Sequence, residues 1–165
     1  MEATRNGHIG VIGTRGTIRS GAYERAIHTL APSLHVTSQA CPMLVPAIEE
    51  GWLEDPLTEA IITRYLGELL ESGIDTLVLG CTHYPLLKPL LARYLGKAIE
   101  LVDSAHNCAL AVKQLLVEHC IAAPEEQFGK FEVALTDASD GFLPVAEKAL
   151  GLELGQVRIV GLPGK

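Results

Sequence analysis

Cys81 lies in the segment that combines the most chemically useful residue types, Gly80-Cys81-Thr82-His83. A thiol close to the start of a helix, with a histidine nearby, is in a setting that favours the thiolate, the form of cysteine that attacks electrophiles and accepts protons. Thr82 adds a hydroxyl and a backbone N–H, and both groups can hold a carboxylate. The segment predicts acid–base or nucleophilic chemistry at Cys81. The alternative, from these residues alone, is a small buried cysteine beside a histidine that bonds within its own turn.

Other uses of cysteine fit the spacing less well. A zinc site needs a second Cys or His pair at a suitable spacing from Cys81 and His83, and the sequence has none, so no metal is predicted. Disulfide exchange uses Cys-x-x-Cys, which is also absent. A Cys–His protease stays an alternative that no further residue supports. The other cysteines are predicted to be small buried residues and not a second reactive thiol: Cys41, Cys108 and Cys120.

The strand that delivers Cys81 is predicted from an apolar run. Thr76–Gly80 ends directly before the cysteine and is typical of a buried strand. Several similar runs lack polar alternation, as parallel strands covered on both faces do. The other predicted strands are His8–Gly13, Leu34–Ser38, Ile99–Val102, Phe131–Thr136 and Val157–Gly161.

Helical patterns separate the predicted strands. The clearest covers Pro56–Ser72, with a proline at the first helical position. Asp55 can cap this helix and Gly73 can end it in a left-handed conformation. Its apolar stripe is expected to face one way and consists of Leu57, Ile61, Tyr65, Leu66, Leu69 and Leu70. Further helices are predicted at Ser20–Leu30, Pro46–Glu50, Lys88–Leu95, Ser104–Cys120 and Gly141–Leu150.

The alternation of strands and helices predicts an α/β fold, a three-layer arrangement in which helices flank a parallel sheet. Ligands bind beyond the carboxyl ends of the strands in such a sheet. Three strand ends are therefore expected to carry the site: Gly13–Thr17, Gly80–Tyr84 and Asp103–Ser104. The polar stretch Ala122–Gln127 is the one plausible boundary along the chain.

Composition narrows the class of protein. The chain has 165 residues, of which 48% are apolar and 20% charged, with a net charge of −7. This apolar content excludes a disordered chain, and the acidic balance argues against nucleic acid as a partner, because phosphate binding needs a basic face. No run reaches the roughly 20 apolar residues of a membrane span, and the first residues do not form a signal peptide. We therefore expect no membrane partner. Since 4 cysteines are few for a disulfide scaffold, we also expect a cytoplasmic location.

The segment Gly80–Leu87 resembles the second cysteine signature of the glutamate racemases, which belong to the aspartate/glutamate racemase superfamily. Two further stretches match that family in order. They are Gly10–Thr14 continuing through Tyr23, and Ala40–Pro46 followed by Glu49 and Gly51. Val102-Asp103-Ser104 also fits. The resemblance covers Gly10 to about Val112 and continues more weakly to the C-terminus.

The resemblance implies interconversion of L- and D-glutamate for peptidoglycan precursor supply, without a cofactor or a metal. Two thiols would act on opposite faces of the α-carbon, one as base and one as acid. Cys81 would be one of them, assisted by His83, with Glu49 as the acidic residue that supports the histidine. Thr82, Thr14 and Thr17 would contact the substrate. The alternatives are a solvated helix-end charge for Glu49 and turn hydroxyls that cap their own backbone for Thr14 and Thr17.

The chain departs from the family in one large respect. Family members begin with another α/β domain, which carries an Asp-Ser-Gly loop, a Tyr-Gly pair and a first catalytic cysteine followed by Asn and Thr, and none of these is found here. We therefore expect residues 1–105 to be the second domain and residues 106–165 to be a returning segment that completes the first. The chain would carry half of a site and be inactive or very weak alone. It would need the missing N-terminal domain or a second chain, and would expose an apolar face or cover it in a homodimer.

Two alternatives to the racemase hypothesis stay open. A decarboxylase-like member of the superfamily needs only one thiol, because a proton delivered to one face suffices. A non-catalytic module that binds a carboxylate or a partner would not depend on Cys81 at all. Activity on a substituted malonate would indicate the decarboxylase. Binding of a carboxylate or a partner that survives Cys81→Ser would indicate the non-catalytic module.

Overall fold

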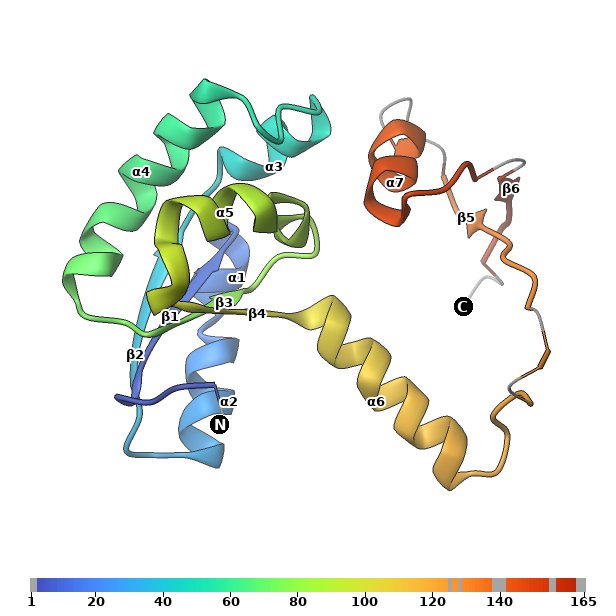
Figure 1. Ribbon diagram of the computed structural model, residues 1–165, viewed down its shortest axis with the longest axis horizontal. Helices are drawn as coiled ribbons and strands as arrows, with labels where there is room; N and C mark the ends of the chain where they lie inside the picture. The colour runs from blue at the N-terminus through green and yellow to red at the C-terminus, as the bar shows by residue number, and fades with distance from the viewer. Residues whose placement is uncertain (1–2, 125, 128, 138–141, 155–156, 163–165) are drawn as a thin grey trace.

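A parallel sheet forms the centre of the molecule. The computed structural model describes residues 3–124, 126–127, 129–137, 142–154 and 157–162. Four strands pair in the order β2-β1-β3-β4 (Figure 1). Their bounds are His8–Gly13 for β1, His35–Ala40 for β2, Thr76–Leu79 for β3 and Glu100–Asp103 for β4. Because all the strands are parallel and in register, their carboxyl ends lie at one edge of the sheet.

Helices cover both faces of this sheet, as the sequence predicts. On one face Gly13 and Gly80 pack against α1 (Arg15–Ser20) and α2 (Ala22–Leu30). The opposite face, which includes Ile12, Leu77 and Leu79, packs into a core with α3 (Leu44–Glu49), α4 (Pro56–Glu71) and α5 (Lys88–Leu95). Two short 3₁₀ helices flank α5: η1 (Tyr84–Leu87) and η2 (Gly96–Ala98). The predicted three-layer α/β fold is confirmed.

Helix α4 has the ends that its sequence predicts. Asp55 accepts a hydrogen bond from the Leu57 N–H at 2.8 Å, and Gly73 has a left-handed φ of 77°. The predicted stripe is wrong at its first member, since Leu57 is 52% exposed. Thr58 is buried in its place, because its hydroxyl donates a 2.6 Å hydrogen bond to the Trp52 carbonyl and so satisfies the polar group.

Several predicted boundaries are shifted. A helix was expected over Ser20–Leu30, but Gly21 adopts a left-handed φ of 60° and separates α2 from α1, which begins earlier, after Thr14. Helix α3 begins at Leu44, ahead of the predicted start, and Pro46 lies in its first turn, where the missing N–H is tolerated. Strand β2 runs on to Ala40, past the predicted end.

Beyond β4 the chain leaves the sheet. Helix α6 (Ser104–Glu118) points away from the strands, and every residue in it is exposed (Figure 1). Exposed large apolar side chains on and just after this helix are Leu110, Val112, Leu115, Leu116, Val117 and Ile121. The expected exposed apolar face is therefore confirmed. Within the described residues, no helix is both long and apolar enough to cross a membrane.

The chain then returns toward α3. Helix α7 (Phe142–Leu150) contacts α3, and its Val145 packs against the main core. Two short parallel strands, β5 (Ala134–Leu135) and β6 (Arg158–Ile159), pair beside α7 (Figure 1). The predicted strands Phe131–Thr136 and Val157–Gly161 are longer than these. Gly141, the predicted start of the last helix, lies outside the described residues, as does Glu125 in the predicted boundary stretch.

The cysteines outside the signature divide between the packed region, residues 3–103, and the described residues that follow it. Cys41 is buried as predicted, and burial raises the pKa of its thiol to about 12. Cys108 and Cys120 are exposed, so the prediction that they are buried is wrong. The reason is that none of the described residues forms a layer that buries α6. Cys120 also lies past the helix end, with a left-handed φ of 56°.

Candidate active site

Cys81 and Thr14 follow neighbouring strands at the carboxyl edge of the sheet. Strands β1 and β3 pair in register up to Ile12 and Leu79. The Gly80 N–H donates a 2.7 Å hydrogen bond to the Ile12 carbonyl, which holds the end of β3 against β1. A Cβ at Gly80 would lie 2.8 Å from that carbonyl oxygen and 2.9 Å from the ring of Tyr23. Glycine is therefore required directly before Cys81 by close packing.

The buried side chain of Tyr84 holds the turn after Cys81 in place. This side chain is fully buried, and its hydroxyl donates a 2.9 Å hydrogen bond to the Cys41 carbonyl at the end of β2. Burial raises the pKa of Tyr84 well above its ordinary value, so the hydroxyl stays a donor. The Tyr84 N–H also donates to the Cys81 carbonyl at 3.2 Å. The turn that carries Cys81 is thereby tied to a second strand end.

Cys81, His83 and Glu49 form a chain of polar contacts. The Cys81 Sγ lies 4.0 Å from His83 Nδ1, and His83 Nε2 lies 3.4 Å from Glu49 Oε1. An ionised carboxylate can only accept hydrogen bonds, so the proton of a neutral His83 ring belongs on Nε2. The lone pair of Nδ1 then faces the thiol, and the histidine can take a proton from it. Contacts of this length are common in catalytic sites before the substrate arrives.

Glu49 is brought to His83 by α3. The carboxylate is 57% exposed and also lines a cavity of about 150 Å³ between α3 and α7. The Glu49 carboxylate is therefore open to solvent and lies close to α7.

Thr14 and Thr17 lie together at the start of α1. Thr14 caps this helix by accepting a 3.2 Å hydrogen bond from the Thr17 N–H, and the two hydroxyl oxygens are 3.0 Å apart. Thr14 therefore caps the backbone of its own turn, as the alternative predicts, but a hydroxyl that accepts one hydrogen bond can still donate another. Thr17 offers its hydroxyl at the same edge of the sheet. Thr82, beside Cys81, is exposed.

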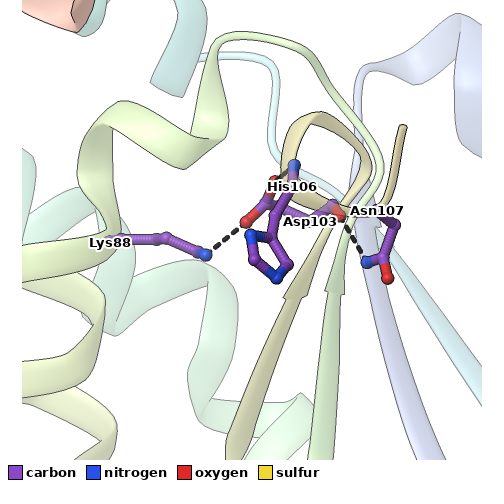
Figure 2. Close-up of polar contacts among 4 residues, drawn as sticks. All are labelled: Lys88, Asp103, His106 and Asn107. Carbon is purple, nitrogen blue, oxygen red and sulfur yellow. Dashed lines mark hydrogen bonds and ion pairs between the residues drawn. The ribbon is translucent and has the colours of Figure 1, made fainter. Parts of the chain in front are cut away.

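Sequence reasoning missed an ion pair at the end of β4. Asp103 is buried and pairs with the ammonium group of Lys88 (Figure 2). Burial alone would raise the pKa of Asp103, but hydrogen bonds from the His106 backbone and Lys88, the positive charge of Lys88 and a bond from the Ala105 backbone hold it below its ordinary value. The two residues are far apart in the sequence, and no local pattern links them. Only the capping role of Asp103 has a sequence signal, an aspartate directly before a helix.

Within the described ranges, no group of three or more His, Cys, Asp or Glu side chains is arranged to hold a metal ion. The chemistry that the described residues offer at this edge is a thiol, an imidazole, a carboxylate and several hydroxyls. This set is suited to moving protons at a small carboxylate substrate.

A protein-family model described as Asp/Glu/Hydantoin racemase matches residues 1–112. The chain belongs to this family. Among curated members of the Asp/Glu/Hydantoin racemase family, the glutamate racemase of Geobacter metallireducens is 43% identical over 159 residues, which are 96% of this chain and 59% of that protein. The chain therefore spans about 59% of the length of the curated relatives it matches.

Solved structures of family members share the fold. Glutamate racemase isoform RacE1 from Bacillus anthracis superposes with a TM-score of 0.86 at 36% identity, covering 99% of this chain and 61% of that one. Glutamate racemase from Francisella tularensis, solved in complex with D-glutamate, gives a TM-score of 0.83 at 32% identity, covering 94% and 58%. Because nearly the whole chain is covered, the match extends beyond the sheet into the region that contains α6.

Proposed function

We propose that this chain carries one half of a glutamate racemase site and acts in the interconversion of L- and D-glutamate. The observation that supports this most directly is the contact chain from Cys81 through His83 to Glu49, at the strand edge where an α/β sheet binds ligands. Family membership and the relatives that are glutamate racemases support the choice of substrate.

In this proposal Cys81 acts on one face of the α-carbon. As thiolate it removes the α-proton: an S–H bond forms, the C–H bond breaks, and the electron pair stays on the carbon and its carboxylate. A protonated group on the opposite face then returns a proton to that carbon. In the reverse direction Cys81 acts as the acid. Positioned proton transfer of this kind contributes about 10²–10⁴-fold to a rate.

His83 and Glu49 have supporting roles. His83 takes the thiol proton on Nδ1 and so prepares the thiolate, while Glu49 holds the Nε2–H and stabilises the imidazolium that results. Cys81, His83 and Glu49 are the catalytic group. Thr82, Thr14 and Thr17 bind the substrate, since a hydroxyl or a backbone N–H can hold a carboxylate at that edge.

The second group on the opposite face belongs to a part that this chain lacks. We propose that residues 1–105 form the second domain of a racemase and that residues 106–165 help to build the first. Two observations support this division: every residue of α6 is exposed, and the relatives are longer than the chain. The partner is a preceding domain or a second polypeptide. A homodimer is the less favoured occupant, because a second copy would bring another Cys81 and not the first cysteine of the family.

The proposed setting follows from the substrate. D-Glutamate is a precursor of peptidoglycan, so the reaction would take place in the cytoplasm and serve cell-wall biogenesis and cell shape. We propose that it needs no cofactor, because two tuned thiols supply both the base and the acid.

A complementation experiment tests the proposal. The chain is mixed with the portion of the Geobacter metallireducens glutamate racemase that it does not match, and incubated with L- or D-glutamate in D₂O. Exchange of the α-proton and racemisation are followed by NMR and circular dichroism. The expected result is turnover by the mixture and very low turnover by either part alone. Normal rates from the chain alone would contradict the half-site.

The same mixture separates the alternatives. Release of carbon dioxide from an aryl- or alkyl-malonate, with no turnover of glutamate, would favour the one-thiol decarboxylase. Glutamate or partner binding without turnover, unaffected by Cys81→Ser, would favour the binding module.

A further inference from the structure

Asp103, the last residue of β4, makes polar contacts with the first turn of both α5 and α6. Its Oδ1 accepts a 2.8 Å hydrogen bond from the His106 N–H and so caps α6. Its Oδ2 pairs with the ammonium of Lys88, the first residue of α5. Figure 2 shows Lys88 reaching this carboxylate from α5, while Asn107 donates a 2.7 Å hydrogen bond to the Asp103 carbonyl. One buried aspartate therefore holds the start of both helices.

This junction lies next to the proposed catalytic turn. Asp103 pairs in register with Leu79, and Cys81 follows shortly after Leu79 on the neighbouring strand. The turn continues into η1, and η1 runs directly into α5 at Lys88. The ammonium that Asp103 holds is thus attached to the same continuous segment as the thiol.

The ion pair has a geometric consequence that packing does not supply. Within the described part of the chain α6 buries no side chain of its own, so its direction is set where it begins. An asparagine would cap a helix as well as an aspartate does, so capping alone does not account for a buried charge at this position. An ion pair with a buried carboxylate gives little net stability relative to apolar residues, and in some proteins such pairs select one arrangement of the groups they join.

We propose that Lys88 and Asp103 are positioning residues: their ion pair fixes the direction in which α6 leaves the sheet relative to the Cys81 turn. The link to catalysis rests on the proposed function, in which α6 leads toward the opposite wall of the cleft. Racemisation requires the two proton-transfer groups to face one carbon from opposite sides. A misplacement of about 1 Å can reduce a rate about 10²-fold.

The first test measures the direction of α6 in the chain itself and needs no activity. Spin labels are placed on α4, through Thr63→Cys, and on α6, at the exposed Cys108. Cys81→Ser and Cys120→Ser remove the other accessible thiols, and Cys41 is buried. The distance between the two labels is measured by pulsed electron–electron double resonance. We expect one narrow distance distribution in the parent and in Lys88→Arg, which keeps the charge. Lys88→Met should broaden or shift it at unchanged far-UV circular dichroism.

Asp103→Asn is the second variant. It keeps an oxygen to cap α6, removes the attraction to Lys88 and leaves no buried carboxylate without a partner. It is expected to broaden the distribution as Lys88→Met does. A distribution that stays narrow and unshifted in both variants overturns the proposal.

The second test uses the complemented racemase. Lys88→Met should lower kcat about 10–100-fold and leave KM for glutamate within about 3-fold, because the substrate contacts stay while the two walls lose alignment. Lys88→Arg should recover most of the rate. A loss confined to KM, or an equal loss in Lys88→Arg, contradicts the positioning role. If the parent mixture itself is inactive, the proposed function fails, and the spin-label distances decide the positioning role alone.

Discussion

Helices α4 and α6 are close in length, at 16 and 15 residues, and both carry large apolar side chains. Helix α4 buries Thr58, Ile62, Leu66 and Leu69 against the sheet, whereas every residue of α6 is exposed. The helices thus differ in what lies against them. In residues 3–103 the apolar side chains of α3, α4 and α5 pack with the sheet into one core. Among the described residues after Asp103, most large apolar side chains are exposed to water, which is typical of a surface that a partner covers.

The largest expected effect compares a thiol from each region. In a chain with Cys81→Ser and Cys120→Ser, we expect Cys108 to react with an aromatic disulfide at least about 10³-fold faster than Cys41 at neutral pH. Cys41 reacts only after the core opens, which requires several kcal/mol, and burial raises its thiol pKa to about 12. Stopped-flow absorbance measures both phases.

The control for this comparison is denaturant. In concentrated urea the two rates should approach one another, because both thiols are then in an unfolded chain. Comparable rates under native conditions would mean that the packed region is open and that the contrast is wrong.

The second effect separates the thiol of the proposed site from the thiol of the exposed helix. In the complemented protein Cys81→Ser should lower racemisation about 10²–10⁴-fold, since serine is a far weaker base and acid, while glutamate binding is retained. Cys108→Ser is the matched control and should leave the rate unchanged. Calorimetry of glutamate binding and the rate of racemisation are measured side by side. Equal losses in both variants would remove Cys81 from its proposed role.

The third effect compares two leucines. Leu66→Ala, in a position that is 1% exposed, should lower the free energy of unfolding by about 2–5 kcal/mol, because it leaves a cavity in the core. Leu115→Ala, at 51% exposure, should change it by no more than about 0.5 kcal/mol. Urea unfolding of the chain alone gives both values.

The two leucine variants also test whether α6 is an interface with a partner. In the complemented mixture Leu115→Ala should weaken association, because its side chain would then lie in an interface. If Leu115→Ala destabilises the chain alone as much as Leu66→Ala does, α6 is packed within the chain and the contrast between the regions fails.

The smallest effect concerns Asp75, at the amino-terminal edge of the packed region, and changes the free energy of unfolding only at acidic pH. Asp75 accepts hydrogen bonds from the Thr4 hydroxyl, the Arg5 and Asn6 N–H groups and the Thr76 hydroxyl. Burial would raise the pKa of Asp75, but these bonds, led by those from Thr4 and Asn6, hold it well below its ordinary value. The stabilisation is therefore fully present above about pH 4, the unfolded pKa, and is lost as the pH falls toward the folded pKa.

We expect the free energy of unfolding to fall from pH 5 toward pH 2 with a shallower slope in Asp75→Asn than in the parent. Thr4→Val removes one donor and should give an intermediate slope. Urea unfolding at several pH values measures this, and parallel profiles for all three proteins would contradict the role of Asp75.

The elements of the packed region could be predicted because their signals are local. A proline, a capping aspartate and a terminal glycine mark α4 within one stretch of sequence, and apolar runs mark β1 and β3. The second region was predicted less well. Runs of apolar and β-branched residues at Phe131–Thr136 and Val157–Gly161 indicate strands, but only two short pieces form. A strand needs neighbours to pair with, and these segments have one each.

The site divides in the same way. Cys81 and His83 are close in sequence, so their contact could be expected from the turn between them. Glu49 was expected near His83 only through resemblance to a family, since residues on different helices share no local pattern. The pair of Lys88 with Asp103 had no signal, and neither had the hydrogen bond from Tyr84 to the Cys41 carbonyl.

The sequence by itself determined the α/β class, the packed strands, the turn that carries Cys81 and the absence of the family's first-domain motifs, because each depends on residue types within a few positions of one another. Only the tertiary structure decided that Glu49 reaches His83, that Lys88 pairs with the buried Asp103 before α6, and that Cys108 and Cys120 face water. The physical reason is that burial and charge pairing depend on which layers the chain brings together, and an apolar helix has the same sequence pattern whether its partner is present or not.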